Sequence, residues 1–360
     1  MPGALGPTSG LQPSPQQIRR VFLEATANRN PTPSSETRWL EPPASVRPES
    51  LADAVERGLF SKPKELPSRF FYDARGSLLF EEICELPEYY LTRAESEILE
   101  HCAPDLARRL PWIATLVELG SGSATKTELL LRAFEADREL RYAPIDVSRA
   151  ALEDSVSRLE DRHPELEIWA AVAEYESGLA ALGRHSLGPR LILWLGSSIG
   201  NLRRSAAARF LERRRETMSS EDRLLVGIDL RKDRDILERA YDDSRGITAR
   251  FDLNLLARIN RELEADFDLE RFAHRVHYDE DLGSVQSFLE SQERQTVRVA
   301  ELDAEIVFEA GERIHTEDSY KYSFEEIDAL ARAADLQLEH RYLDDAELFS
   351  LNLFAPRPRT

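Results

Sequence analysis

A glycine-rich turn and a single acidic residue further along the chain are the first side chains that could bind a ligand. Residues 118–123 read E-L-G-S-G-S, and glycines at 120 and 122 let a backbone turn tightly and approach a ligand closely. Asp146 ends the next apolar run, where a carboxylate can accept hydrogen bonds from both ribose hydroxyls of a nucleoside. Together these residues favour a nucleoside cofactor; a plain tight turn and a helix cap at Asp146 are the alternatives.

The residue where a third glycine would stand narrows the choice of cofactor. Dinucleotide-binding turns follow the pattern G-x-G-x-x-G, but the position three after Gly122 is Thr125, which argues against NAD. The acidic Glu118 beside the turn suits a cationic ligand end better than a pyrophosphate. A terminal antiparallel hairpin, expected at 336–343 and 349–356, also favours S-adenosylmethionine over a dinucleotide. These features favour S-adenosylmethionine.

Several polar side chains could complete this cofactor site. Lys126 could contact the carboxylate of the cofactor, and Glu174 with Tyr175 could hydrogen-bond and cover an adenine ring. Gly196 and Asn201 belong to a loop that follows an almost wholly apolar strand, and Asn201 offers both a donor and an acceptor. A solvated lysine, a surface helix start and a helix cap are the respective alternatives.

A second group of side chains could hold a substrate. Tyr89 and Tyr241 lie in polar runs, and a tyrosine at a cleft presents an apolar ring with a hydroxyl tip. Glu317 and Ser319 alternate on an expected strand, so both point to the same face, where they could bind N–H groups. Buried structural tyrosines and an exposed polar strand face are the alternatives.

A parallel sheet is needed to bring these residues together. From residue 114 onward, apolar strands alternate with helices, which predicts an α/β fold with a doubly wound sheet. Residues 236 to about 280 are expected to be mainly helical, and 284–308 alternate as an antiparallel sheet would. Thr92 and Glu95 match the Thr-x-x-Glu capping box of a helix start.

This pattern divides the chain into a tail and two domains. Residues 1–45 are rich in Pro, Ser, Gly and Asn and are predicted to be disordered. The segments 46–94 and 231–320 would form a discontinuous α+β substrate-binding domain, and 95–230 with 321–360 a cofactor-binding domain. A ligand would bind where the two meet, outside the carboxyl ends of the parallel strands.

Composition excludes several classes of protein. The chain has 360 residues, with 66 acidic against 47 basic side chains and a formal net charge of −19, which disfavours nucleic acid and membrane surfaces as partners. Two cysteines cannot form a disulfide framework, and His274-x-x-His277 lacks a third ligand, so no metal is predicted. With no apolar run long enough for a membrane span and no signal peptide, we expect a cytoplasmic protein. We also expect it to be a monomer.

A series of motifs runs in one order from about residue 48 to the end. They are F-Y-D-A-R-G-S-x-L-F at 71–80, L-P-E-Y-Y-x-T-R-A-E at 86–95, E-L-G-S-G-S-x-x-K-T at 118–127, L-G-S-S-I-G-N-L at 195–202, D-L-R-K-D with A-Y-D-D-x-x-G-I-T-A-x-F within 229–251, N-R-E-L-x-A-D-F-D at 260–268, and 316–321. With them the chain resembles the histidine Nα-methyltransferases of the ergothioneine pathway. The resemblance implies a class I methyltransferase-like fold and three successive methyl transfers from S-adenosylmethionine to the α-amine of L-histidine, giving hercynine.

The resemblance also implies a role for each matching position. The cofactor would be bound by Gly120, Lys126, Asp146, Glu174, Tyr175 and Gly196. The substrate would be bound by Tyr72, Tyr89, Asn201, Tyr241, Glu317 and Ser319. Among these, Asn201 and Tyr241 would contact the substrate carboxylate, and Glu317 and Ser319 the imidazole. No general base is assigned.

Two places depart from the family pattern. Ala173-Glu174-Tyr175 stands where the family usually has Gly-Asp-Phe, and Ser287 stands where a methionine is expected in the substrate pocket. The serine favours an alternative in which the same chemistry acts on another amino acid, such as tryptophan or tyrosine. A further alternative, from another class, is a non-catalytic nucleoside-binding protein that kept the fold.

Overall fold

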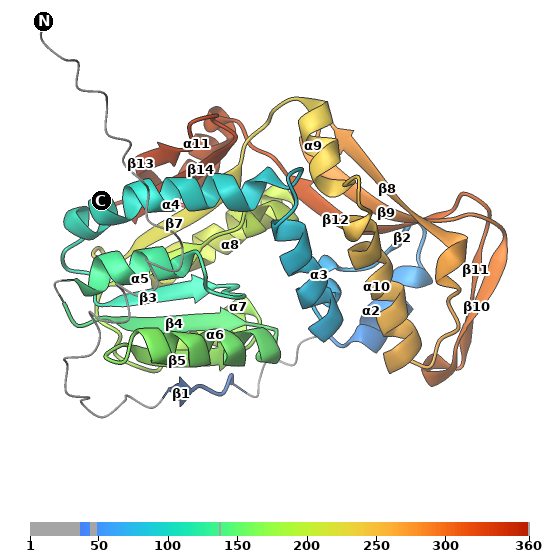
Figure 1. Cartoon of the computed structure of the whole chain (residues 1–360), viewed down its shortest axis with the longest axis horizontal. Coiled ribbons are helices and arrows are strands. Elements are labelled where there is room, and N and C mark those ends of the chain that lie inside the picture. Colours follow the sequence, from blue (N-terminus) through green and yellow to red (C-terminus); the bar gives the residue numbers. More distant parts are fainter. Residues whose placement is uncertain (1–36, 44–48, 137, 359–360) are drawn as a thin grey trace, which may run out of the picture.

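A central eight-stranded sheet forms the larger half of the molecule (Figure 1). The computed structural model describes residues 37–43, 49–136 and 138–358. The strands of this sheet are β1 (Arg38–Trp39), β3 (Thr115–Leu119), β4 (Arg141–Asp146), β5 (Glu167–Val172), β6 (Arg190–Trp194), β7 (Arg223–Asp229), β13 (Leu336–Leu343) and β14 (Phe349–Pro356). Their order is β1-β5-β4-β3-β6-β7-β14-β13. Neighbours from β1 to β7 run parallel, whereas β14 is antiparallel to β7 and β13, which confirms the predicted doubly wound sheet with a terminal hairpin.

Helices cover both faces of this sheet. One face packs against α4 (Tyr90–Arg109), α5 (Thr127–Glu135) and α6 (Arg149–Arg162), and the other against α7 (Tyr175–Leu182), α8 (Arg204–Thr217) and α11 (Phe324–Ala333). Within β6, Leu191 and Leu193 belong to the first of these cores, and Ile192 and Trp194 to the second. A strand that is buried on both sides needs apolar residues at every position, which explains the unbroken apolar run.

A smaller four-stranded sheet forms the other half (Figure 1). Its strands, in spatial order, are β2 (Lys64–Glu65), β12 (Arg313–Tyr320), β9 (Ser284–Ser291) and β8 (Phe272–Asp279). Around it lie α2 (Leu51–Leu59), α3 (Ala74–Cys84), α9 (Arg234–Tyr241), α10 (Ile247–Glu262) and the hairpin of β10 (Gln295–Val299) with β11 (Ala304–Phe308). Four short 3-10 helices are η1 (Ser68–Phe71), η2 (Ser198–Asn201), η3 (Leu269–Arg271) and η4 (Ala300–Leu302).

Strand β8 corrects one prediction. The segment 236 to about 280 is helical only in α9 and α10, because residues 272–279 pair with β9 along their whole length. Inward-facing Phe272, His274 and Tyr278 are buried in this strand. Most of the residues beside these three are charged or histidine. The hydropathy pattern therefore did not reveal the alternation of a strand.

Strand β1 corrects the predicted extent of the disordered tail. Most of residues 1–45 lie outside the described residues, but Arg38 and Trp39 are ordered and pair with Trp169 and Ala170 of β5. The Arg38 guanidinium also lies 5.0 Å from the centre of the Trp169 ring, a cation–π contact. The composition of residues 1–45, which is poor in apolar side chains, did not predict this strand. The pairing depends on backbone hydrogen bonds and on one aromatic ring of β5.

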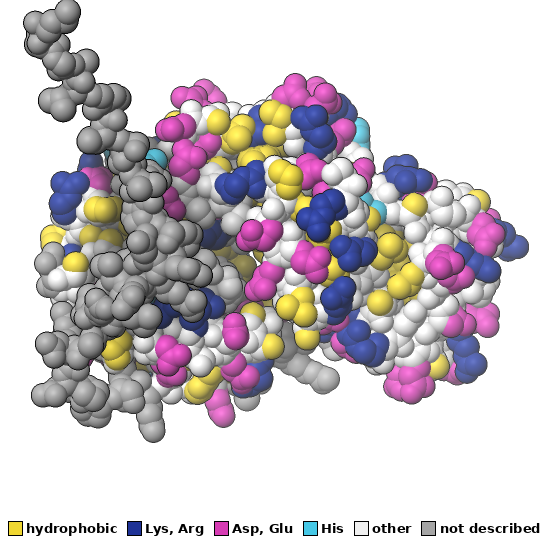
Figure 2. Space-filling model, in the orientation of Figure 1, with side chains coloured by type: hydrophobic (Ala, Val, Ile, Leu, Met, Phe, Trp, Pro, Cys, Tyr) yellow, Lys and Arg dark blue, Asp and Glu magenta, His cyan; other side chains and the backbone are white. Residues whose placement is uncertain are grey.

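Charges of both signs are mixed on the surface. On the face shown in Figure 2, acidic and basic side chains are interspersed among white and yellow regions rather than gathered by sign. No helix among the described residues has both the length and the apolar character that crossing a bilayer requires. The surplus of acidic residues in the whole chain thus produces no extended single-sign area on this face.

Candidate active site

The turn after β3 and the acid at the end of β4 are joined directly. Gly120 and Gly122 both have positive φ, at 75° and 49°. The backbone N–H of Gly122 donates to Oδ2 of Asp146 at 2.8 Å, and the N–H of Ser148 donates to Oδ1 at 2.8 Å. Ser148 caps α6, so Asp146 is not the helix cap. The structure therefore brings together the two elements that the sequence singled out first.

This corner fits a nucleoside. Each oxygen of Asp146 accepts one backbone hydrogen bond and keeps lone pairs that a ribose hydroxyl can use. A Cβ atom built on Gly122 would meet nothing within 4 Å, so there is open space next to the turn. Burial raises the pKa of Asp146, and the N–H groups of Ser148 and Gly122 oppose the rise. Asp146 and Gly122 are thus suited to hold the sugar of a nucleoside.

Glu118 has a different environment from the one expected. It is buried at 3 % exposure, and its two oxygens accept hydrogen bonds from the Thr127 hydroxyl at 2.5 Å and from the Tyr142 hydroxyl. Burial raises the pKa of Glu118 to about 7, although these two donors lower it. Because protein donors occupy the carboxyl group, the predicted contact with a cationic ligand end is disfavoured.

Glu118 should make the stability of the protein depend on pH. Its pKa rises from 4.5 in the unfolded chain to about 7 in the folded one, so the folded protein binds more protons between these values. The free energy of unfolding should therefore fall by about 3 kcal/mol as the pH rises through this window. We expect Glu118→Gln to make that part of the pH profile of the melting temperature less steep, measured from pH 4.5 to 8; the slope that remains comes from Glu317, whose pKa is also raised to about 7. Parallel profiles for the two proteins would contradict the assignment.

Glu95, which the sequence predicted to cap a helix, contacts both Lys126 and Gly196 instead. The Lys126 ammonium forms an ion pair with Glu95 of α4, and Glu95 is fully buried. Both oxygens of Glu95 also accept the N–H of Gly196, at 2.8 and 2.9 Å. Glu95 lies well inside α4 and does not form the predicted capping box, because α4 already begins at Tyr90.

Removing Glu95 should destabilise the fold. Glu95→Ala leaves the Lys126 ammonium and the Gly196 N–H without their acceptor. We expect the free energy of unfolding to fall by about 2 to 3 kcal/mol, the usual range for a lost charged hydrogen bond in a largely buried setting. Chemical denaturation would measure the change, with Glu100→Ala on the exposed side of the same helix as the control. Equal losses in both variants would refute the role of Glu95.

Tyr175 lies beside the glycine turn, and Glu174 lies at the surface. The ring of Tyr175 packs against Trp194 and Phe210, each at 6.0 Å between ring centres. Its hydroxyl is 3.0 Å from the point where a Cβ of Gly120 would lie, so only glycine fits there. The Glu174 side chain is 42 % exposed and lies 3.6 Å from the Arg69 guanidinium.

Tyr241 and Ser319 meet at one point although they come from different elements. Tyr241 ends α9, Ser319 lies on β12, and their hydroxyl oxygens are 2.8 Å apart. The ammonium of Lys321 donates to the hydroxyl oxygen of Tyr241 at 2.8 Å and to that of Ser319 at 2.9 Å. It also pairs with Asp229, the last residue of β7, at 2.8 Å. The larger sheet is thereby linked to the predicted substrate residues.

Glu317 lies on the same strand face as Ser319. Its partner in β9 is Ser287, the position that departs from the family pattern. Burial raises the pKa of Glu317 to about 7, with a further increase from Asp252 and an opposing effect of Lys321. Among the described residues, none donates a hydrogen bond to this carboxylate, which leaves it able to bind N–H groups of a ligand.

Aromatic rings stand near this carboxylate. The Tyr89 ring packs edge-on against Tyr241 at 6.2 Å, and the Tyr72 ring packs edge-on against Phe80 at 5.5 Å. Burial raises the pKa of the Tyr72 hydroxyl, and the carboxyls of Glu317 and Asp146 raise it further. Tyr72 therefore lies within electrostatic reach of both the cofactor corner and the predicted substrate residues.

Asn201 is exposed at the end of η2. A Cβ built on the preceding Gly200 would lie 2.8 Å from the backbone oxygen of Tyr320, so η2 packs closely against the end of β12. The loop after β6 is thus brought beside the strand that carries Glu317 and Ser319. The proximity of Asn201 to the other predicted substrate residues therefore stays a prediction.

A buried histidine was missed as a site residue. The Nδ1 atom of His274 lies 2.7 Å from Oδ2 of Asp252, and Nε2 lies 2.9 Å from the backbone oxygen of Tyr241. Both partners only accept hydrogen bonds, so both ring nitrogens carry a proton and His274 is cationic. Burial lowers the pKa of His274, but Asp252 outweighs that effect and the pKa is raised. No local sequence pattern signals this pair, whose members lie on α10 and β8.

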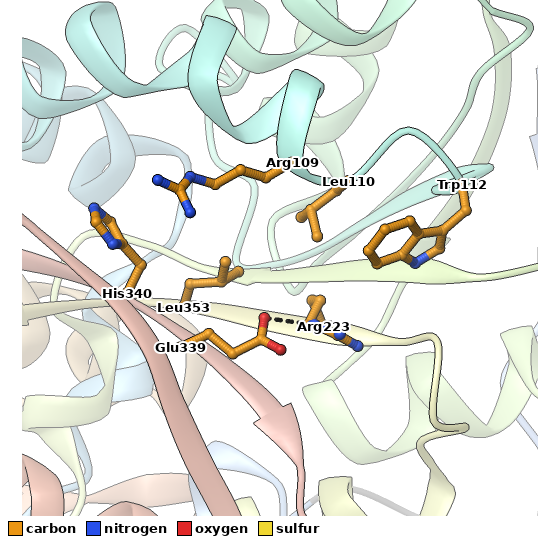
Figure 3. A pocket seen from close by; sticks show the side chains of 7 residues that line it. All are labelled: Arg109, Leu110, Trp112, Arg223, Glu339, His340 and Leu353. Atoms are coloured by element: carbon orange, nitrogen blue, oxygen red, sulfur yellow. Dashed lines mark hydrogen bonds and ion pairs between the residues drawn. The ribbon is translucent and has the colours of Figure 1, made fainter.

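A separate cavity lies away from these residues. It has a volume of about 290 Å³ and is lined by Arg109, Leu110, Trp112, Arg223, Glu339, His340 and Leu353 (Figure 3). Arg223 begins β7, whereas Asp229 ends it, so the cavity lies at the opposite end of the strand from the candidate site. An ion pair of 2.7 Å joins Arg223 to Glu339 there. None of the predicted site residues lines this cavity.

Comparison with known proteins finds a matching family model and several similar proteins. Residues 51–356 match a family model described as histidine-specific methyltransferase, SAM-dependent. The chain is 42 % identical over 307 residues to histidine N-alpha-methyltransferase of Mycolicibacterium smegmatis, covering 85 % of this chain and 94 % of the relative. It is 32 % identical over 305 residues to ergothioneine biosynthesis protein 1 of Schizosaccharomyces pombe, covering 82 % and 38 %. Among solved structures, the CcbJ methyltransferase of Streptomyces caelestis matches with a TM-score of 0.42 and 11 % identity, covering 73 % and 90 %.

Proposed function

This chain belongs to the family of S-adenosylmethionine-dependent, histidine-specific methyltransferases, and from that premise we propose that it adds three methyl groups to the α-amine of L-histidine. The product would be hercynine, the trimethylated histidine from which ergothioneine is made. The observation that carries the choice of substrate is Glu317, an accessible carboxylate without a protein donor, next to the hydroxyls of Ser319 and Tyr241. A neutral imidazole ring offers its one N–H to the Glu317 carboxylate and its lone pair to the Ser319 hydroxyl.

We propose two sets of binding residues. The cofactor is bound by Gly120, Lys126, Asp146, Glu174, Tyr175 and Gly196. The substrate is bound by Tyr72, Tyr89, Asn201, Tyr241, Glu317 and Ser319. The hydrogen bond between Gly122 and Asp146 supports the first set, and the contact between Tyr241 and Ser319 supports the second. The carboxyls of Glu317 and Asp146 both raise the pKa of the Tyr72 hydroxyl, which supports a place for Tyr72 near both sets.

The proposed chemistry requires mainly positioning. When bound, S-adenosylmethionine supplies an electrophilic methyl carbon, so that a C–N bond forms to the amine as the C–S bond breaks. The protein must hold a neutral amine in line with that carbon, since a protonated amine has no lone pair. Burial keeps the pKa of the Tyr72 and Tyr89 hydroxyls well above the usual value, so both remain neutral groups that can orient the amine. Each new N-methylammonium must lose a proton before the next transfer, and no residue is assigned as its acceptor.

Ser287 favours a second candidate substrate class. It is buried and faces Glu317 across the strand pair, so its small side chain leaves more space there than a methionine would. Extra space could accept a larger aromatic side chain, such as that of tryptophan. We place this alternative second, because an indole would use the Glu317 carboxylate but would leave the neighbouring hydroxyl hydrogen unpaired.

Mass spectrometry tests the proposal directly. Histidine incubated with the protein and S-adenosylmethionine should gain one, two and then three methyl groups. The same assay with tryptophan, tyrosine and the remaining amino acids tests the second candidate. No methylation of histidine beside good methylation of another amino acid would overturn the proposal. Calorimetric binding of S-adenosylmethionine without transfer to any amine would instead favour a non-catalytic nucleoside-binding protein.

Three expectations from the sequence stay predictions. They are the monomeric state, the cytoplasmic location and the division into a substrate-binding domain (46–94 and 231–320) and a methyltransferase domain (95–230 and 321–360). Light scattering coupled to size-exclusion chromatography would test the first of them. Limited proteolysis, which cleaves between independently folded units, would test the domain boundaries.

A further inference from the structure

The ring of His274 joins two helices that pack on the smaller sheet. His274 lies on β8; its Nδ1–H donates to Oδ2 of Asp252 in α10 at 2.7 Å, and its Nε2–H donates to the backbone oxygen of Tyr241 in α9 at 2.9 Å. The side chains of His274 and Asp252 are each 2 % exposed. Both helices pack against β8 and β9, so the ring is buried between the sheet and the two helices.

The oxygen that accepts from His274 belongs to Tyr241, the last residue of α9. The final carbonyl groups of a helix have no N–H partner within it, and a buried one needs a donor from elsewhere. His274 supplies that donor. Its cationic ring also lies at the helix end where the backbone dipole is negative, which adds to the attraction. His274 therefore fixes the position of this end of α9.

The side chain of Tyr241 extends from this same point toward the proposed substrate residues. Its hydroxyl oxygen accepts from Lys321 at 2.8 Å, and the hydroxyl oxygen of Ser319 lies 2.8 Å away. Burial raises the pKa of the Tyr241 hydroxyl, although Lys321 opposes the rise, so the group keeps its hydrogen and can donate to a carboxylate. Where it donates depends on the backbone of Tyr241, and a misplacement of about 1 Å can lower a rate by about 100-fold.

We propose that His274 and Asp252 are positioning residues for the substrate. Asp252 orients the ring of His274, and the ring holds the end of α9 so that the Tyr241 hydroxyl is placed for the substrate carboxylate. The inference rests on the proposed function, in which Tyr241 binds the carboxylate of the amino acid. Both residues act through Tyr241 rather than on the substrate itself.

The charges of the pair act oppositely on Glu317. His274 lies on the sheet face that carries Glu317, because Val276, two residues further on, shares with Glu317 the pairing partner Ser287. Burial is the largest cause of the raised pKa of Glu317, Asp252 raises it further, and His274 opposes it. Removing one charge alone would therefore disturb Glu317, whereas removing both keeps the net charge around it. The test uses variants that neutralise the two residues together.

Asp252→Asn is the variant that keeps the contact with Tyr241. Among the described residues, none forms a hydrogen bond with the other oxygen of Asp252, Oδ1, so an amide of the same shape can turn its NH2 group toward the ring without losing a partner. Burial lowers the pKa of His274 and leaves the ring neutral once the carboxylate is gone. Its Nδ1 then accepts from the amide, and its Nε2–H still donates to Tyr241. The affinity for L-histidine should stay close to that of the wild type.

Asp252→Asn/His274→Leu is the variant that removes the contact. It has the same net charge as Asp252→Asn and lacks the ring that donates to Tyr241. Calorimetry with S-adenosylhomocysteine present should show an about tenfold lower affinity for L-histidine, the effect of weakening one hydrogen bond to a charged group. The affinity for S-adenosylhomocysteine itself should not change. Equal histidine affinities in the two variants would overturn the inference, and so would an equal loss for both ligands, which a merely structural role would produce.

A double-mutant cycle tests whether the ring acts through Tyr241. Tyr241→Phe removes the hydroxyl but keeps the backbone oxygen that accepts from His274. In this background the tenfold difference between the two variants should disappear, because the hydroxyl that the ring places is gone. A difference that persists would show that His274 acts on the substrate by another route, which would overturn the inference.

A spectroscopic measurement keeps the test decisive if Asp252→Asn/His274→Leu does not fold. The nitrogen NMR signals of the His274 ring show which nitrogens are protonated, and we expect both in the wild type and only Nε2 in Asp252→Asn. A proton on Nδ1 instead, with unchanged histidine affinity, would refute the role of the hydrogen bond to Tyr241. Failure of the proposed function has a different signature, since a wild type that binds histidine without methylating it contradicts the activity alone. A wild type that does not bind histidine contradicts both.

Discussion

Asp146→Ala is expected to weaken the binding of S-adenosylmethionine by about 100-fold. The substitution removes both carboxylate oxygens that can accept hydrogen bonds from the ribose hydroxyls, and charged hydrogen bonds contribute about 1.5 to 3 kcal/mol each. It also frees the N–H groups of Gly122 and Ser148, which now hold the turn after β3 against the turn after β4. Calorimetric titration with S-adenosylhomocysteine would measure the loss.

Asp161→Ala is the matched control for this experiment. Asp161 lies on α6, which follows Asp146 in the chain, and it is exposed. This variant removes one acidic charge from the same region without touching the turn, so its affinity for the cofactor should equal that of the wild type. If Asp146→Ala also bound the cofactor as the wild type does, the nucleoside site would have to lie elsewhere.

Glu317→Ala is expected to weaken histidine binding by about 2 to 3 kcal/mol, which is about 30- to 150-fold. Removing the carboxylate takes away the acceptor for the imidazole N–H, while the opposing Ser319 and Tyr241 hydroxyls remain. Calorimetry with histidine in the presence of S-adenosylhomocysteine would measure the change. The affinity for S-adenosylhomocysteine itself should stay constant, since Glu317 belongs to the other set of residues.

Asp318→Ala serves as the control for this prediction. Asp318 is the next residue on β12, but its carboxylate contacts Gln286, Ser284 and His315. Its removal should therefore leave the affinity for histidine close to that of the wild type. A Glu317→Ala protein with unchanged histidine affinity would show that the imidazole is bound by other groups.

Periodicity in the sequence was sufficient to predict the larger sheet except for its edge strand β1. Strands such as β6 are apolar at every position because helices cover both of their faces, and this pattern is visible in one dimension. The turn at Gly120 and Gly122 and the acid at Asp146 follow from the same argument, since they mark the ends of adjacent parallel strands. Site residues that directly follow a buried parallel strand can thus be identified from the sequence.

Other roles depend on contacts between distant segments and could not be predicted. Glu95 matched a local capping pattern, but its acceptors serve Lys126 and Gly196, which lie 31 and 101 residues further along the chain. His274 and Asp252 come together only because α10 packs against β8. Strand β8 itself carries charged residues between its buried ones, and Lys321 acquires its partners from three different elements. In each case the partner, rather than the residue type, determines the role.

The pairing of Asp229 with Lys321 limits how the molecule can move. Asp229 ends a strand of the larger sheet, Lys321 directly follows a strand of the smaller one, and both are completely buried. A hinge motion that opened the two lobes would separate these charges, and an unpaired buried charge costs several kcal/mol. The ion pair therefore resists opening at this junction, where Lys321 would lose its carboxylate while Asp229 keeps Lys232.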